Sequence, residues 1–134
     1  MKFFAYLAML ALSTLASAAT PADFIRQYAA EAQVDQPGFT SSHQRGATFF
    51  KQRFNHSETL PGCNTCHTDN PLNAGRHAVT GKTIRPLASA TNVERFTDPG
   101  KVEKWFGRNC KEVLGRACTS AEKADFVTYM SEVR

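Results

Sequence analysis

The residues whose types and spacing most clearly carry chemistry are Cys63, Cys66 and His67, in the run Cys63-Asn64-Thr65-Cys66-His67. This C-x-x-C-H spacing is the attachment signature of c-type haem. Each thiol can form a thioether to one edge of a porphyrin, and the adjacent imidazole can bind the iron as the proximal ligand. Because the motif occurs once, the sequence predicts one covalently bound haem c.

Two other uses of these residues were weighed. A thiol–disulfide redox motif of this spacing is expected in a βαβ setting, and the sequence has no matching strand pattern. A zinc site needs further ligands at suitable spacing, and the available cysteines are Cys110 and Cys118. In an exported chain these two cysteines would more readily oxidise. The haem interpretation is therefore favoured.

The first residues predict export. Lys2 gives a short positive region, residues 3–15 are apolar apart from Ser13 and Thr14, and the small residues Ala16-Ser17-Ala18 follow. This order is typical of a cleaved signal peptide over residues 1–18, with cleavage after Ala18. The alternative, a membrane anchor, would need roughly 20 apolar residues. We expect a soluble periplasmic protein, with no stable membrane insertion after signal removal.

Charge and composition exclude one class of partner. The 134-residue chain carries a formal net charge of +4, and its basic residues are scattered among acidic ones. Nucleic-acid-binding proteins usually show a block or stripe of basic residues. We therefore expect no nucleic-acid partner.

The elements that must position the motif read as helices. Thr20-Pro21-Ala22-Asp23 predicts a helix start, and Pro37-Gly38 predicts its end. Further helices are expected from about Ser42 to Arg53, from Asp98, and from Thr119 to near the end, with a long loop over 68–91 and no clear strand. The prediction is an all-α chain with an N-terminal helical extension over 19–40 and a domain over 41–134.

These features resemble a class I cytochrome c. The resemblance rests on Gly46 and Phe50 in the helix before the motif, on the motif itself, on the long loop, and on Tyr129 in the last helix. It implies the class I cytochrome c fold around the haem. Class I electron carriers usually supply a Met as sixth ligand from the region after the motif. Here residues 68–120 contain no Met, and Met130 is expected to pack in the core.

The remaining candidates for a distal ligand are His77, Lys101, Lys104, Lys111 and Asn109. His77 is expected to be exposed or to bond a propionate, and the lysines to form a solvated face. Asn109 is unusual because it lies in an apolar stripe with Val102, Trp105, Phe106 and Val113, and a buried amide requires partners. Iron is one possible partner, and a helix-closing or backbone-bonding role is the alternative.

The segment Trp105-Phe106-Gly107-Arg108-Asn109-Cys110, with the missing Met and with Cys118, resembles the SHP-type (sphaeroides haem protein-like) cytochromes c. These are high-spin, oxygen-binding haem proteins. The resemblance implies that Asn109 is the distal iron ligand of the ferric protein and leaves on reduction, and that Cys110 and Cys118 form a disulfide. Trp105, one turn before Asn109, would wall the distal pocket.

Three functions fit such a site. The first is a monohaem cytochrome that accepts an electron and then binds, or reduces, oxygen, nitric oxide or another small diatomic ligand. The second is a simple electron-transfer cytochrome, and the third is a gas-binding sensor or scavenger without turnover. The resemblance implies a dihaem cytochrome c or another cytochrome as electron donor. Basic residues of the distal helix could dock an acidic partner; they are Lys101, Lys104, Arg108 and Lys111.

Overall fold

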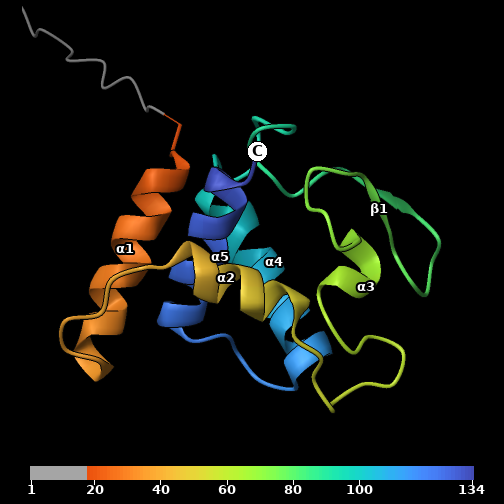
Figure 1. Ribbon diagram of the computed structural model, residues 1–134, viewed down its shortest axis with the longest axis horizontal. Coiled ribbons are helices and arrows are strands. Elements are labelled where there is room, and N and C mark those ends of the chain that lie inside the picture. Colours follow the sequence, from red (N-terminus) through yellow and green to blue (C-terminus); the bar gives the residue numbers. More distant parts are fainter. Residues whose placement is uncertain (1–17) are drawn as a thin grey trace, which may run out of the picture.

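The computed structural model describes residues 18–134, and helices form most of it (Figure 1). The elements in chain order are α1 (Pro21–Asp35), α2 (His43–Lys51), α3 (Asn64–His67), β1 (Gly75–Arg76), β2 (Thr83–Ile84), α4 (Pro99–Leu114) and α5 (Ser120–Glu132). The prediction that residues 1–18 form a signal peptide lies outside this range except for Ala18.

Capping boxes begin the first and last long helices, as the sequence predicts. At α1 the Thr20 hydroxyl accepts a hydrogen bond from the Asp23 N–H, and the Asp23 carboxylate accepts one from the Thr20 N–H. Thr119 and Glu122 exchange the same two bonds at α5. Each box satisfies backbone donors that a helix start leaves free. Both starts therefore follow from local sequence.

The loop after the haem motif contains a short sheet that the sequence does not reveal. β1 and β2 pair antiparallel, with Gly75 opposite Ile84 and Arg76 opposite Thr83. The expectation of no strand is wrong at these positions. Strands of two residues are too short to display a period-two pattern, so the pairing comes from the turn between them rather than from alternation.

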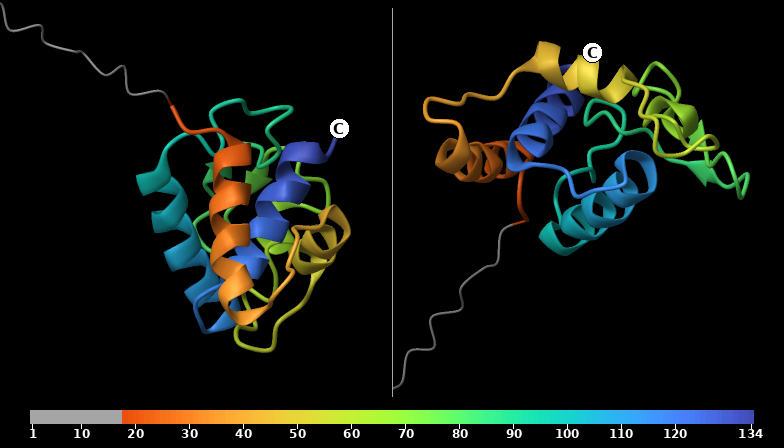
Figure 2. Two further views of the ribbon diagram at one scale, coloured as in Figure 1. Left: turned by 90° about the vertical axis from the view of Figure 1, so that its left-hand side faces the viewer. Right: turned by 90° about the horizontal axis from the view of Figure 1, so that it is seen from below.

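Helix α5 lies in the middle of the helical part, with α1 along one side and α2 crossing another (Figures 1 and 2). The crossing of α2 and α5 requires a glycine. A Cβ on Gly46 would lie 2.0 Å from the backbone oxygen of Asp125 and 2.8 Å from the Tyr129 Cβ. Fully or almost fully buried core residues come from several of the helices: Phe24, Tyr28, Phe50, Val102, Ala124, Val127, Tyr129 and Met130.

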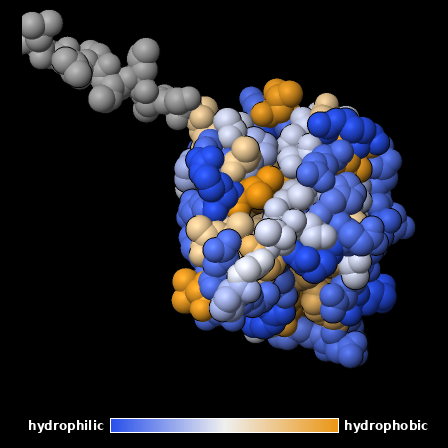
Figure 3. Space-filling view, turned by 60° about the vertical axis from the view of Figure 1, so that its left-hand side comes forward, coloured by the Kyte–Doolittle hydropathy of each residue, from blue (hydrophilic) through white to orange (hydrophobic). Residues whose placement is uncertain are grey.

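The N-terminal extension shares this core. Tyr28 of α1 is 1% exposed and its ring meets the Phe106 ring of α4 edge-on, at 5.9 Å between centroids. Phe106 in turn packs on Phe126 of α5. The face of the molecule over α1 is mainly hydrophilic, with small separate apolar areas (Figure 3). No helix within residues 18–134 is long and apolar enough to cross a membrane.

Candidate haem site

The C-x-x-C-H motif forms a single helical turn at the side of the molecule away from α1 (Figure 1). Cys63 is the residue before α3, and its carbonyl oxygen accepts hydrogen bonds from the N–H groups of Cys66 (3.3 Å) and His67 (3.2 Å). One turn of helix separates the two sulfur atoms, so both thiols can reach one edge of a planar ligand. Neither cysteine forms a disulfide.

The thiol chemistry argues against a redox-active dithiol. Burial raises the pKa of the Cys63 thiol to about 11. Reactive cysteines of thiol–disulfide enzymes have lowered pKa values, because the thiolate is the nucleophile. The zinc alternative also fails in the described range, where no group of three or more His, Cys, Asp or Glu side chains could hold a metal ion.

His67 is present as a neutral imidazole at neutral pH. Burial, and then electrostatic interactions with Arg95 and His77, lower the pKa of His67 to about 4. A neutral ring keeps a nitrogen lone pair, which is the form that binds iron. Free thiols one turn apart and a neutral, half-buried imidazole next to them are the donor set that a covalent haem requires.

The loop after the motif is held tightly against it. A Cβ on Gly75 would lie 2.1 Å from the Cys66 carbonyl oxygen, so only glycine allows this approach. The Ala78 N–H donates to the Cys66 Sγ at 3.2 Å. A thioether sulfur keeps its lone pairs, so this contact is compatible with attachment of Cys66 to a porphyrin. Residues of β1 and of the turn after it thus pack directly against Cys66.

Two polar groups of the loop bond within it. His77 is half-buried rather than fully exposed, and its Nδ1 accepts the N–H groups of Val79 and Thr80, while the expected bond to a propionate stays a prediction. The Pro86 carbonyl accepts hydrogen bonds from Asn92 Nδ2 and Arg95 Nε, each at 2.9 Å.

Helix α4 presents Trp105 and Asn109 on one flank, one turn apart. Val102 and Val113 are buried and Phe106 is half-buried, as the stripe predicts. Asn109 and Trp105 are not part of this buried set: Trp105 is 44% exposed and Asn109 is exposed. The side chains around α4 therefore do not bury the Asn109 amide, and its expected contact with the haem iron stays a prediction. The two side chains lie at the edge of the buried stripe.

Asn109 does not close the helix either. α4 continues to Leu114 and ends at Gly115, which adopts a left-handed conformation with φ 75°. A Cβ on Gly115 would also lie 2.5 Å from Nδ1 of His56. Glycine is favoured there for both reasons. Within residues 18–134 the Asn109 side chain makes no hydrogen bond, so the structural role considered for it is not seen.

A disulfide joins Cys110 to Cys118, with 5.6 Å between their Cα atoms. This is the pairing that the SHP resemblance implies. The bridge connects the last turns of α4 to the segment before α5, and it lies directly after Asn109 in the sequence. It therefore restrains the backbone next to the candidate ligand.

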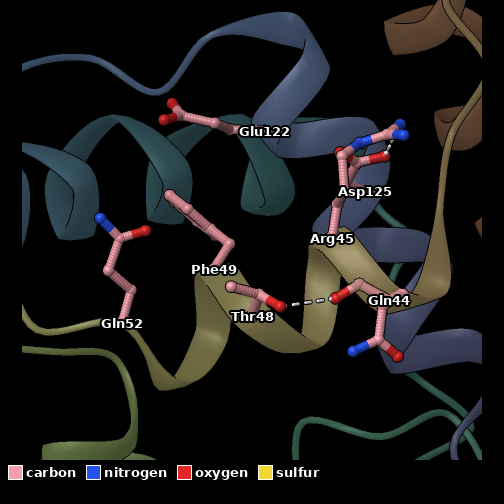
Figure 4. A pocket seen from close by; sticks show the side chains of 7 residues that line it. All are labelled: Gln44, Arg45, Thr48, Phe49, Gln52, Glu122 and Asp125. Carbon is pink, nitrogen blue, oxygen red and sulfur yellow. Dashed lines mark hydrogen bonds and ion pairs between the residues drawn. The ribbon is translucent and has the colours of Figure 1, made fainter.

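A hollow elsewhere on the surface does not involve the haem motif. It lies between α2 and the start of α5, and its lining includes Phe49, Gln52 and Glu122 (Figure 4). At its end the Asp125 carboxylate, 8% exposed, accepts hydrogen bonds from Nε and Nη2 of Arg45. These contacts stabilise the helix crossing, and the haem motif contributes no residue to the hollow.

Comparison with known proteins decides the family. Residues 37–130 match the family described as "Domain of unknown function (DUF1924)". The chain is 40% identical over 131 residues to cytochrome c-type protein SHP of Cereibacter sphaeroides, covering 97% of both chains. The chain belongs to the SHP family of c-type cytochromes. As an SHP-type cytochrome it carries one covalently bound haem c, and its helical fold is that of a cytochrome c.

Solved structures agree with this assignment. The structure of oxidised SHP, described as an oxygen-binding cytochrome c, has a TM-score of 0.78 at 39% identity and covers 85% of this chain and 97% of its own. The solution structure of Methylophilus methylotrophus cytochrome c'', described in terms of haem-ligand detachment, has a TM-score of 0.70 at 38% identity. It covers 82% of this SHP-type chain and 90% of its own.

One polar cluster near the distal helix was missed by sequence reasoning. The Tyr28 hydroxyl donates to the Glu103 carboxylate, which also accepts from Lys123 Nζ at 2.9 Å. Tyr28 stands in the apolar stripe of α1, and a buried tyrosine hydroxyl needs a partner. The sequence therefore indicates that the Tyr28 hydroxyl has a hydrogen-bond partner, but it does not show which charged residue that partner is.

Proposed function

We propose that this SHP-type cytochrome is an exported monohaem protein in which Asn109 is the distal iron ligand of the ferric form. On reduction Asn109 detaches, and a small diatomic ligand such as oxygen or nitric oxide takes its place. The haem supplies a redox-active iron with one exchangeable coordination position. The observation that carries the proposal is the family relationship to an oxygen-binding cytochrome, over nearly the whole chain.

The geometry supports the residue roles that we propose. Cys63 and Cys66 are assigned as the thioether residues, and His67 as the proximal ligand. On the distal side, the shared flank of Trp105 and Asn109 on α4 places an aromatic wall beside the candidate ligand. The disulfide of the neighbouring Cys110 limits how far the backbone at Asn109 can move when its side chain detaches.

Ligand release on reduction agrees with the chemistry of an amide. Asn offers a weak, hard donor, and hard donors prefer the more highly charged metal. The side chain should therefore bind the ferric form and be released from the ferrous form. The relationship to cytochrome c'', described in terms of haem-ligand detachment, supports this behaviour. Once free, the Asn109 amide N–H could donate a hydrogen bond to the incoming diatomic ligand.

The electron donor that we propose is another cytochrome, such as a dihaem cytochrome c. Exposed basic residues on the outer face of α4 support an acidic docking partner; they are Lys101, Lys104, Arg108 and Lys111. Such charges act mainly by steering the encounter. The Cys110–Cys118 disulfide supports placing the protein in the periplasm, because disulfides persist in oxidising compartments.

The decisive experiment compares optical spectra of the ferric, ferrous and carbon monoxide-treated protein for wild type and Asn109→Ala. We expect the ferric spectrum to change and the ferrous and carbon monoxide spectra to stay close to wild type. Alanine has a higher helix propensity than asparagine, so the substitution should not unfold α4. Asn73→Ala, an exposed asparagine of the loop, serves as control. An unchanged ferric spectrum in Asn109→Ala would contradict the proposal.

Two further measurements separate the alternatives. A simple electron carrier should not bind carbon monoxide at ordinary concentrations, whereas an SHP-type site with a released ligand should. Steady consumption of oxygen or nitric oxide with a continuous electron supply distinguishes a protein that turns over from a sensor or scavenger.

A further inference from the structure

Arg95 is a half-buried cation that has no carboxylate partner within residues 18–134. Its Nε donates to the Pro86 carbonyl and its Nη2 to the Arg85 carbonyl, each at 2.9 Å. No acidic side chain in the described part of the chain forms an ion pair with it. Buried charges are normally paired, because their desolvation is costly. The Arg95 guanidinium is therefore available to pair with an anion that is not a side chain of the described residues.

Arg85, which lies in the same segment, does have a carboxylate partner. Arg85 lies at the surface and forms an ion pair with Glu94, at 2.5 Å between Nη1 and the carboxylate. Burial, and then the positive charge of Arg85, lower the pKa of Arg95. The two guanidinium groups thus lie close enough to interact, and Glu94 pairs with the exposed one, Arg85.

The same segment also holds unsatisfied polar atoms. In the described part of the chain, two buried side-chain polar atoms lack a hydrogen-bond partner, Ser89 Oγ and Asn92 Oδ1. Asn92 is 4% exposed, and its Nδ2 shares the Pro86 carbonyl with Arg95. Unsatisfied buried polar atoms are rare in folded proteins. Asn92, which shares an acceptor with the unpaired Arg95 guanidinium, thus leaves a buried oxygen free to bond a further polar group.

The location identifies that group. Arg95 is close enough to His67 for its charge to act on the imidazole. A haem attached beside His67 brings two carboxylates on one porphyrin edge, and a planar guanidinium suits a carboxylate because it can donate two parallel hydrogen bonds. We infer that Arg95 binds a haem propionate, and that Asn92 holds the Arg95 guanidinium in position through their shared acceptor, Pro86.

This inference depends on the haem alone and not on Asn109. A cation paired with a propionate close to the iron disfavours the ferric state relative to the ferrous state. Arg95 should therefore raise the midpoint potential and fix the orientation of the porphyrin. The Nη1 of Arg95, which has no partner among the described residues, is the group available to the carboxylate.

The test uses the haem-loaded protein and three variants, Arg95→Gln, Arg95→Lys and Arg85→Gln. Resonance Raman spectroscopy reports the propionate bending band, which responds to hydrogen bonding of the carboxylate. Electrochemical titration reports the midpoint potential. Arg85→Gln is the matched control, because it removes the same charge from the same segment at the exposed, already paired position.

We expect Arg95→Gln to shift the propionate band and to lower the midpoint potential several times more than Arg85→Gln. Arg95→Lys keeps the charge but loses the planar pair of donors, so the band should shift while the potential falls less. A propionate band at its wild-type position in Arg95→Gln would overturn the inference. If Arg95→Gln does not fold, an unshifted band in Arg95→Lys overturns it.

Discussion

At the scale of single residues, two helical glycines have opposite surroundings. Gly46 lies where α2 crosses α5, with the Asp125 backbone oxygen 2.0 Å from the position of a Cβ. Gly107 lies within α4 and a Cβ there would meet nothing within 4 Å. Substitution by alanine should therefore lower the free energy of unfolding at Gly46 and raise it at Gly107.

Gly46→Ala should destabilise the protein by about 3 kcal/mol or more, because the contact is with backbone and the helices must separate. Gly107→Ala should stabilise it by roughly 0.5–1 kcal/mol through helix propensity. Denaturant unfolding of the two variants beside wild type measures both. Equal effects at the two positions would show that the close approach at Gly46 does not control stability.

Residue types predicted a covalently bound haem, because the chemistry of the C-x-x-C-H motif depends on spacing along one helical turn; the roles of Cys63, Cys66 and His67 stay predictions. Residue types did not predict that neighbouring side chains leave Asn109 exposed. A stripe on a helical wheel has edges, and small rotations decide on which side of the edge a residue lies. The role of Arg95 could not be predicted, since its partners come from a folded loop without regular pattern.

At the scale of elements, the N-terminal helix is tied to the distal helix by charge as well as by packing. Glu103 of α4 accepts hydrogen bonds from Tyr28 of α1 and Lys123 of α5. Burial opposes ionisation of Glu103, but the bonds from Lys123 and Tyr28 outweigh it and hold the pKa of Glu103 below its usual value. The carboxylate thus joins three helices.

Glu103→Gln should reduce the free energy of unfolding by about 1 kcal/mol at neutral pH, since the carboxylate is half exposed and partly screened. Because the pKa of Glu103 is lowered on folding, its contribution is present above the usual glutamate pKa and is lost as pH falls through the lowered value. The difference in the free energy of unfolding between Glu103→Gln and wild type should therefore become smaller as the pH is lowered. Glu112→Gln, which affects an exposed pair with Arg108, is the control and should show little effect at any pH.

The disulfide makes a separate contribution. The chain-entropy relation for a bridge between residues eight apart in sequence gives a stabilisation of about 2.5 kcal/mol. The double variant Cys110→Ser/Cys118→Ser should be less stable than wild type by about that free energy, as measured by thermal unfolding. The same variant should show a weaker ferric Asn109 signature in the optical spectrum, and an unchanged spectrum would show that the bridge serves stability alone.

Helix starts were predictable because capping depends on residues three apart, as at Thr20 and Thr119. The strand pair of Gly75 and Ile84 was not, since it is too short to leave a pattern and depends on the turn that connects it. Local signals thus specified where the four long helices begin. The course of the connecting loop depends on contacts distant in sequence, such as the Gly75 approach to Cys66.

At the scale of the whole molecule, exposed basic side chains lie along α4, near the proposed distal side. The outer face of α4 carries Lys101, Lys104, Arg108 and Lys111, and Lys104 and Arg108 lie over the Trp105 ring at 5.6 and 5.8 Å from its centroid. An acidic partner attracted to this face would approach the same helix that carries Asn109. Electron delivery and ligand exchange would then share one side of the protein.

The double variant Lys104→Glu/Lys111→Glu should slow reduction by an acidic cytochrome donor by roughly 10-fold at low salt, because steering charges act on the association rate. At high salt the rates of reduction of variant and wild type should become equal, because the charges are screened. Lys51→Glu/Arg53→Glu changes the net charge equally at a different exposed place and should slow the reaction less. Stopped-flow kinetics across ionic strength provides the measurement, and equal slowing by both variants would refute docking at α4.

The two cysteine pairs place conflicting demands on biosynthesis. Cys110 and Cys118 must be oxidised to each other, whereas Cys63 and Cys66 must remain thiols until they add to the porphyrin. Thiol–disulfide exchange in an oxidising compartment can also join the wrong sulfurs, above all the closely spaced Cys63 and Cys66. Assembly therefore requires an oxidant for one pair and a reductant for the other in the same compartment. A host for recombinant production has to supply both.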